Sequence, residues 1–250
     1  MTYATYPSLK GRTVFISGGA SGLGEEFVRQ FAAQGARVGF IDIDEKKGAA
    51  LLAELGDSAR FIRCDVREIS HLEAAISQIA AELGPITVLV NNAANDMRHT
   101  LSELDVDQWD NRQAVNVRHH VFAARAVAPM MDEAGGGSII NLGSISAHID
   151  LPDLVGYITA KAGIEGLTRA LARDLGPRHI RVNCVIPGWV MTQRQLSTWV
   201  TPEAIAHIEA SQCLTEKLYP EDVARMVLWL GSDDSAKCTA QKWVVDGGWL

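Results

Sequence analysis

The chain has 250 residues, of which 30 are acidic and 23 basic, so its formal net charge is −7. This length suits one α/β domain with a full core, and the absence of a basic cluster excludes nucleic acid as an expected partner. No apolar run approaches the roughly 18 residues of a membrane span, and the first twelve residues lack the apolar stretch of a signal peptide. The four cysteines are scattered, with neither a Cys-x-x-Cys motif nor the spacing of metal ligands. We therefore expect a cytoplasmic protein with reduced thiols, no metal site and no membrane contact.

Short β-rich runs alternate with longer helical ones along the chain. Strands are expected over residues 13–17, 36–42, 59–64, 86–91, 138–142, 180–185 and 241–246. Helices are expected over residues 23–34, 45–55, 70–83, 106–133 and 220–231, with another that carries Tyr157 and ends near residue 175. Such alternation is typical of a doubly wound parallel sheet. We predict a single Rossmann-type α/β domain over residues 1–250, with a seven-stranded parallel sheet flanked by helices.

Residues 189–218 break this rhythm. The segment is polar, contains Pro202, and lies between the sixth expected strand and the last helix. It follows the carboxyl end of a strand, where ligands bind in sheets of this kind. We therefore expect a substrate lid here, rather than only a long surface insertion.

A glycine-rich turn, Ser17-Gly-Gly-Ala-Ser-Gly-Leu-Gly24, lies directly between the first strand and the first helix. Glycines at 18, 22 and 24 let the backbone turn tightly and approach a diphosphate at the helix N-terminus. Asp42 ends the second strand, about 20 residues on, where its carboxylate would accept hydrogen bonds from ribose hydroxyls and repel a 2′-phosphate. Ile43 and Asp44 follow it instead of Arg or Lys. The sequence therefore favours NAD over NADP.

Tyr157 and Lys161 are four residues apart in a helix-forming segment, which places both side chains on one helical face. A phenol, whose usual pKa is about 10, ionises more easily beside a positive charge, so we expect Lys161 to lower the pKa of Tyr157. Ser144 follows the fifth strand, where its hydroxyl could hold a substrate oxygen. A surface Tyr and Lys would look the same in isolation, but the glycine turn on the same chain favours an active site.

Together these motifs resemble the short-chain dehydrogenase/reductase family over the whole chain. The matching positions are Gly18, Gly22, Gly24, Asp65, Asn91, Asn92, Ala93, Asn116, Ser144, Tyr157, Lys161, Pro187, Gly188 and Thr192. Ser17 stands where the family usually has Thr, and Ala94 where it usually has Gly. The resemblance implies that Tyr157 is the general acid/base and that Lys161 bonds the nicotinamide ribose. It also implies that Ser144 positions the substrate oxygen and that Asn116 holds a water in the proton relay.

The motifs and the resemblance also imply a site for NAD. The expected cofactor-binding residues are Gly18, Ser21, Gly22, Leu23, Gly24, Asp42, Ile43, Asp65, Val66, Asn92, Ala93, Tyr157, Lys161, Pro187, Gly188, Val190 and Thr192.

Longer runs narrow the resemblance. The segments 91–99, 116–119 and 143–148 are similar to those of bacterial aldose 1-dehydrogenases of the D-xylose dehydrogenase type. The implied reaction oxidises the anomeric hydroxyl of a D-xylose, L-arabinose, D-galactose or L-fucose type sugar to a lactone and reduces NAD. Many hydrogen-bonding side chains around a pocket suit such a polyhydroxylated substrate. The expected substrate-binding residues are Asn95, Arg98, Ser144, Ser146, His148, Tyr157, Trp189, Gln193 and Arg194.

Two other functions stay open at this point. One is a short-chain dehydrogenase for another alcohol or ketone, such as a polyol, a ketoacyl thioester or a hydroxysteroid. The other is a non-catalytic NAD-sensing or scaffold protein, against which the complete set of Asn116, Ser144, Tyr157 and Lys161 argues.

Trp249 would be costly to expose, so we expect it at a subunit interface of the homotetramer that the resemblance implies. The sequence leaves open which sugar and which anomer is used.

Overall fold

Seven apolar runs form the strands of one sheet in the computed structural model, which describes residues 4–250. They are β1 (Thr13–Ser17), β2 (Arg37–Asp42), β3 (Ala59–Arg63), β4 (Ile86–Asn91), β5 (Gly137–Leu142), β6 (Ile180–Pro187) and β7 (Lys242–Val245). Every pair of neighbours is parallel, and the strand order is β3-β2-β1-β4-β5-β6-β7. The predicted Rossmann-like α/β domain with a seven-stranded parallel sheet is confirmed.

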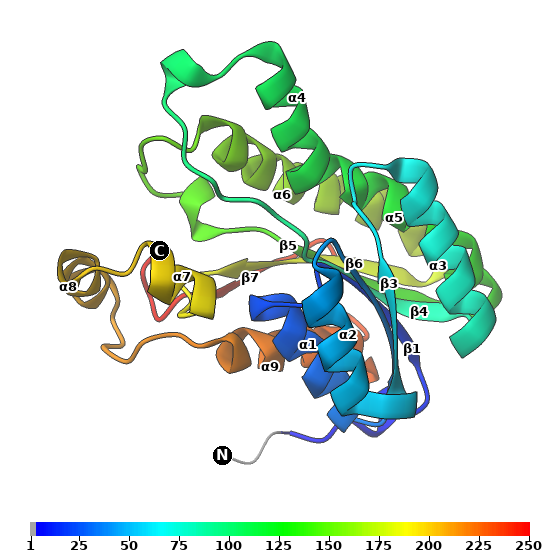
Figure 1. Cartoon of the computed structure of the whole chain (residues 1–250). Coiled ribbons are helices and arrows are strands. Elements are labelled where there is room, and N and C mark those ends of the chain that lie inside the picture. The colour runs from blue at the N-terminus through cyan, green and yellow to red at the C-terminus, as the bar shows by residue number, and fades with distance from the viewer. Residues whose placement is uncertain (1–3) are drawn as a thin grey trace.

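Helices cover both faces of this sheet (Figure 1). One face carries α1 (Gly22–Ala33), α2 (Glu45–Leu55) and α9 (Pro220–Gly231). The other carries α3 (Ile69–Leu83), α5 (His119–Glu133) and α6 (Val155–Leu175). Side chains alternate along β1, so that Val14 and Ile16 join the first core while Phe15 joins the second. Because both faces are covered, the strands read as nearly continuous apolar runs.

The direction of winding reverses at β1, which pairs with β2 on one side and with β4 on the other. Ligands of open α/β sheets bind in the crevice that this reversal leaves beyond the carboxyl ends of the strands. The sheet thereby fixes which loops can form a site: those that follow β1, β2, β4, β5 and β6.

The single long helical region expected over 106–133 is interrupted. It consists of α4 (Val106–Gln113), a π-helical turn (Ala114–Arg118) and α5. Asn116, in the π turn, accepts a hydrogen bond from Asn95 N (2.8 Å) with Oδ1 and donates one from Nδ2 to Asn95 O (3.1 Å). Turns of this kind interrupt α-helices frequently at functional sites. Here the turn fixes the backbone that follows β4.

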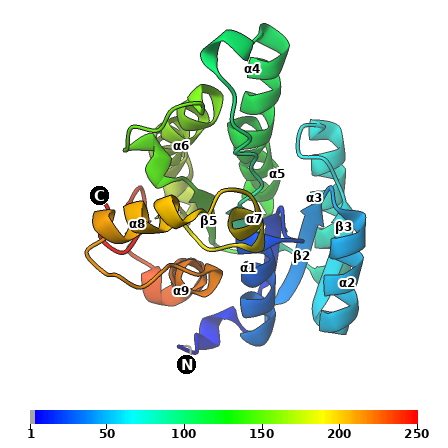
Figure 2. The same cartoon turned by 60° about the vertical axis from the view of Figure 1, so that its left-hand side comes forward.

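Residues 189–218 contain two short helices, α7 (Gln193–Thr198) and α8 (Pro202–Ser211). The Thr192 hydroxyl caps α7 by accepting from Gln195 N (3.3 Å), and the Thr201 hydroxyl caps α8 by accepting from Ala204 N (3.2 Å). Both helices lie beyond one end of the sheet in Figure 1 and come to the front in Figure 2. A parallel bridge between Val190 and Leu218 closes the base of this segment.

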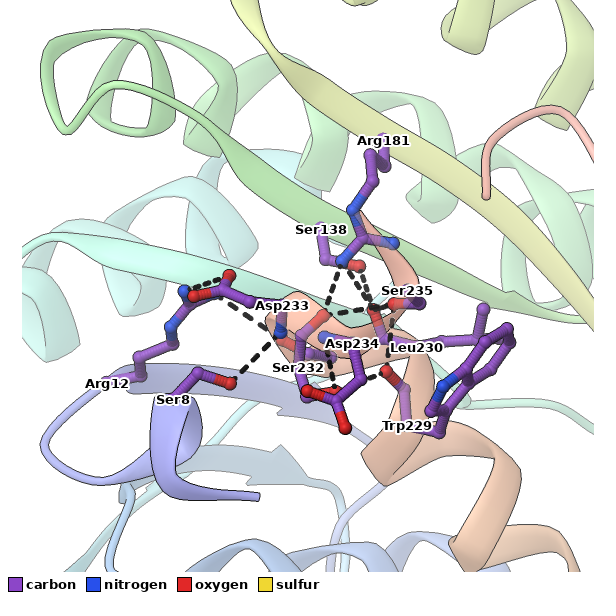
Figure 3. A network of polar contacts seen from close by, with 11 residues as sticks. Ser8, Arg12, Ser138, Arg181, Trp229, Leu230, Ser232, Asp233, Asp234 and Ser235 are labelled. Carbon is purple, nitrogen blue, oxygen red and sulfur yellow. Dashed lines mark hydrogen bonds and ion pairs between the residues drawn. The ribbon is translucent and has the colours of Figure 1, made fainter. Parts of the chain in front are cut away.

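A polar network fastens the end of α9 to the sheet (Figure 3). Arg181 of β6 donates to Leu230 O (2.8 Å) and Ser232 O (3.1 Å), and the Ser138 hydroxyl of β5 also donates to Leu230 O (2.7 Å). These donors satisfy carbonyl groups that the end of a helix leaves without intrahelical partners. The network lies near the amino ends of β5 and β6, away from the crevice.

No helix among residues 4–250 combines the length and apolar character that crossing a membrane would require. The four cysteines carry free thiols, as their spacing predicts.

Candidate active site

A cavity of about 220 Å³ opens beyond the carboxyl ends of β4, β5 and β6. Its walls come from the loops after these strands, the first turns of α6, and helices α7 and α8. The structure therefore brings together residues that are up to 226 positions apart in sequence, from Leu23 to Trp249. The predicted site residues that line it are Leu23, Asn92, Arg98, Ser144, Ser146, Tyr157, Lys161, Pro187, Gly188, Trp189, Val190 and Thr192.

Tyr157 and Ser144 meet through their hydroxyl groups in this cavity. Ser144 Oγ accepts hydrogen bonds from Ser146 N (3.2 Å) and Ser146 Oγ (2.8 Å). Since both of these contacts use Ser144 as an acceptor, its own O–H is left to donate to Tyr157. The arrangement presents two adjacent hydroxyl oxygens to a substrate.

Lys161 lies one helical turn below Tyr157 and is 2% exposed. Its Nζ donates to Leu142 O (2.7 Å) at the end of β5 and lies 5.5 Å from the centroid of the Tyr157 ring. The predicted sharing of one helix face is therefore confirmed. The ammonium group sits over the ring and is held there by a strand carbonyl.

Burial dominates the electrostatics of this pair. It raises the pKa of Tyr157 to about 12; Asp96 raises that pKa further, while the hydrogen bond with Ser144 and the charge of Arg194 oppose the rise. Burial also lowers the pKa of Lys161 to about 8. The expectation that Lys161 makes Tyr157 acidic is wrong for the residues of the chain by themselves, because removing a phenolate from water is unfavourable. These residues keep Tyr157 protonated at neutral pH.

Several predicted substrate residues have partners within the chain and lie outside the cavity wall. Asn95 Oδ1 accepts from Met97 N (2.9 Å), and His148 Nε2 contacts Glu165 Oε1 (2.5 Å). Arg194 pairs with Asp96. Gln193 is exposed at the start of α7, and Gln195, two residues further on, lines the cavity in its place. Asn116 is fully buried and acts on the site through the backbone of Asn95.

Sequence reasoning missed part of the wall. Gln195, Trp199, His207 and Trp249 all line the cavity. Within its own chain, the Trp249 indole lines the cavity and meets the ring of His207 edge to face, with 5.3 Å between centroids, while its place at a subunit interface stays a prediction. Arg98 lines the cavity as predicted and stacks on Trp199, 4.9 Å from the ring centroid. The only sequence signal that could have indicated these side chains is the number of aromatic residues in and near the expected lid.

The glycine turn packs tightly against the end of β4. Gly18 has φ +66°, and a Cβ added there would lie 2.8 Å from Ala93 Cα, so this approach requires glycine. Asn92 Nδ2 bridges the turn by donating to Ser17 O and Gly18 O (3.0 Å each). Within the described residues, the side chain of Ser21, the N-cap residue of α1, accepts no hydrogen bond from the first turn of that helix. The side chain of Asp44, in contrast, caps α2. The first N–H groups of α1 are therefore available to an anion such as a diphosphate.

Asp42 is fixed beside this turn. Its Oδ2 accepts from Ala20 N (3.0 Å) and its Oδ1 from Asp44 N (3.0 Å), which leaves each oxygen a further lone pair. Asp65 differs from Asp42 in that a cationic side chain binds its carboxylate. Arg67 donates hydrogen bonds to that carboxylate and holds the pKa of Asp65 below its usual value. Val66 is buried, while Ser21 and Ile43 are exposed at the edge of the crevice. The uncapped helix, the glycine turn and Asp42 fit a dinucleotide.

Behind the cavity, His119 and His120 are fully buried at the start of α5. His119 Nε2 donates to Ala93 O (3.0 Å), and His120 Nδ1 lies 3.2 Å from Asn141 Oδ1. Burial lowers the pKa of His119 to about 4 and that of His120 well below 6.5. Both imidazoles are therefore neutral in the folded protein at pH 7, and they pack in the core behind the cavity wall.

Proteins of known function share this architecture. Residues 18–250 match a family model described as Enoyl-(Acyl carrier protein) reductase. D-xylose 1-dehydrogenase of Caulobacter vibrioides (strain NA1000 / CB15N) is 52% identical over 252 residues, which cover 100% of both chains. A probable galactose dehydrogenase of Rhizobium meliloti (strain 1021) is 44% identical and covers 97% of this chain and 96% of its own. The solved structure of 7α-hydroxysteroid dehydrogenase with NADH and 7-oxo glycochenodeoxycholic acid has a TM-score of 0.92 and 29% identity, covering 99% and 98%.

A dinucleotide crevice beside a Ser-Tyr-Lys cavity defines an oxidoreductase with a nicotinamide dinucleotide cofactor. The chain belongs to the short-chain dehydrogenase/reductase family.

The buried histidines predict that stability falls as pH falls below 6.5. Their folded-state pKa values lie below the unfolded value, so the unfolded chain takes up protons first and is stabilised. For His119 the free energy of unfolding should drop by on the order of 2 kcal/mol between pH 6.5 and 5. Denaturant unfolding of His119→Gln should show a smaller drop over this range, while the exposed His71→Gln should behave like the wild type. An unchanged pH dependence in His119→Gln would contradict the assignment.

Proposed function

We propose that this protein oxidises an aldose at its anomeric hydroxyl and transfers the hydride to NAD. The observation that carries the proposal is the Tyr157–Ser144 hydroxyl pair in a small cavity whose wall also offers Asp96, Arg98 and Gln195. The relatives with 52% and 44% identity, named as sugar dehydrogenases, support the same class of substrate.

The reaction removes a hydride from C1 and a proton from the hydroxyl on C1. A cyclic hemiacetal that loses both becomes a lactone, so the product is an aldonolactone. When bound, an oxidised nicotinamide supplies the hydride acceptor together with a positive charge. In the proposed mechanism Ser144 Oγ holds the anomeric hydroxyl and Tyr157 accepts its proton.

Lys161 acts below this pair. Its ammonium group, anchored on Leu142 O, keeps the phenol ring in place and offers its remaining N–H donors to a cofactor ribose. Asn116 positions the loop after β4 through Asn95 and, as the resemblance implies, holds the relay water. Because the chain by itself raises the pKa of Tyr157, we infer that the phenol becomes a base only after the cofactor binds.

The cofactor residues divide by the part of NAD that they meet. The glycine turn and the first N–H groups of α1 would hold the diphosphate, with Asp42 on the adenosine ribose. Pro187, Gly188, Val190 and Thr192 would enclose the nicotinamide. The negative charge of Asp42 favours NAD over NADP, because it repels a 2′-phosphate.

Residues 189–218 act as the lid in this proposal, since Val190, Thr192, Gln195, Trp199 and His207 all face the cavity. A location in the cytoplasm and assembly as a homotetramer stay predictions from the sequence.

Another alcohol is the second candidate substrate. Ile149, Leu151 and Leu154 give one wall of the cavity an apolar surface, which a hydroxysteroid would also contact. Initial rates with NAD on a panel of aldoses, polyols and hydroxysteroids separate the two. We expect the fastest turnover with a pentose or hexose; failure of every such sugar to reduce NAD would end the sugar assignment.

In the same assay Tyr157→Phe should lower kcat by about 10²–10⁴-fold, because it removes the proton acceptor. NAD binding, followed by protein fluorescence, should be retained. Tyr6→Phe, which removes a phenol hydroxyl far from the cavity, should keep wild-type turnover. Unchanged turnover in Tyr157→Phe would refute the role of Tyr157.

Asp42→Asn should increase the kcat/KM ratio of NADP over NAD by about 10–100-fold, because it removes one like charge near the 2′ position while it keeps an acceptor for Ala20 N or Asp44 N. Asp110→Asn, at an exposed carboxylate on α4, is the matched control and should leave the ratio near that of the wild type. Comparable kcat/KM values with both cofactors in the wild type would overturn the argument from Asp42.

A further inference from the structure

Asp96 follows β4 and lines the cavity, and no group of the substrate has been assigned to it above. Its carboxylate is held from the side of α7 by two donors. Arg194 Nη2 lies 2.6 Å from Oδ1, and Gln195 Nε2 donates to Oδ2 (2.8 Å). The side chain is 26% exposed, so it is neither sealed in the core nor free in solvent.

The orientation of Gln195 is set by a third residue. Trp189 Nε1 donates to Gln195 Oε1 (3.1 Å). An indole N–H can only donate, so the amide oxygen must face Trp189 and the amide NH₂ must face Asp96. Trp189, Gln195 and Asp96 thus form a chain of donors and acceptors with only one self-consistent direction. It fixes the carboxylate in the cavity wall before any substrate arrives.

This carboxylate still has lone pairs to offer. A carboxylate accepts about four hydrogen bonds, and Asp96 uses one on each oxygen toward α7. Hydroxyl groups are the substrate groups that could donate to the remaining positions, and two neighbouring hydroxyls match the two oxygens. A carboxylate or phosphate on the substrate would instead meet a like charge.

The surroundings of Asp96 fit the same substrate chemistry. Trp189, Trp199 and Trp249 line the same cavity and contribute apolar indole surface to its wall. A sugar ring has C–H groups on its faces and hydroxyls on its rim, so it suits indoles beside a fixed carboxylate. A hydrocarbon ring system would leave the carboxylate without donors, which is unfavourable once water is excluded.

We propose that Asp96 determines substrate specificity by accepting hydrogen bonds from two neighbouring ring hydroxyls of a neutral aldose, while Arg194 and Gln195 hold its carboxylate in place. This inference rests on the proposed sugar dehydrogenase function and names the residue that recognises the hydroxyl groups of the sugar.

The test combines Asp96→Asn with substrates that lack one hydroxyl. The kcat/KM with NAD is measured for the aldose that the wild type oxidises fastest and for its 2-, 3- and 4-deoxy analogues. A hydrogen bond to a charged group contributes about 1.5–3 kcal/mol, so loss of a contacted hydroxyl should lower the wild-type value by about 10–150-fold. Asp96→Asn should lower kcat/KM for the complete sugar by a similar factor, mainly through KM.

The decisive result is non-additivity. In Asp96→Asn, removal of the contacted hydroxyl should cost less than about threefold, because its partner is already weakened, whereas removal of other hydroxyls should cost the same as in the wild type. A purely structural role of Asp96 would lower all substrates alike. Equal losses in wild type and variant for every deoxy sugar would therefore overturn the inference, while aldose oxidation by the wild type would leave the proposed function standing.

Two further variants complete the experiment. Arg194→Gln keeps the carboxylate and removes one support, so it should weaken binding of the complete sugar but retain the wild-type dependence on the contacted hydroxyl. Asp110→Asn, at an exposed carboxylate on α4, should behave as the wild type with every substrate. Loss of the hydroxyl dependence in Asp110→Asn would contradict the assignment to Asp96, and a wild type inactive on all aldoses would overturn the inference and the proposed function together.

Discussion

The hydrogen bond from Lys161 Nζ to Leu142 O (2.7 Å) is the contact on which the rest of the site depends. It joins the helix that carries Tyr157 to the strand that ends before Ser144, and so sets the distance between their hydroxyls. It also holds an ammonium group in a buried place, where its pKa falls to about 8. The same burial raises the pKa of Tyr157 to about 12. In the chain by itself this phenol therefore stays protonated at neutral pH, and its role as a base after the cofactor binds is the proposal made above.

The parallel sheet explains why so many distant segments meet at this phenol. Carboxyl ends of parallel strands share one edge, so the loops after β4, β5 and β6 are neighbours there. The π turn around Asn116 fastens one of these loops, and Asp96 fastens α7 to the same loop. Fixed polar groups and indoles in the same lining give the cavity a mixed polar and apolar character.

Sequence reasoning recovered the elements that depend on local patterns. The seven apolar runs, the glycine turn and the spacing of Tyr157 and Lys161 each follow from short stretches of chain. The π turn was missed because the same residues could continue an α-helix. Gln193 was predicted and Gln195 missed because the phase of α7 depends on where its Thr192 cap lies. The direction of the Tyr157 pKa was wrong because spacing shows which groups are neighbours but shows neither burial nor where an ammonium points.

The account is tested most directly by titrating Tyr157 itself. The phenolate absorbance of the wild type minus that of Tyr157→Phe, followed against pH, isolates this one ionisation. In the protein alone we expect no Tyr157 ionisation below about pH 11, because burial raises its pKa to about 12. With saturating NAD the ionisation should move down by more than about one pH unit, as a nearby positive charge requires. Ionisation at or below pH 10 in the protein alone, or no change with NAD, would contradict the account.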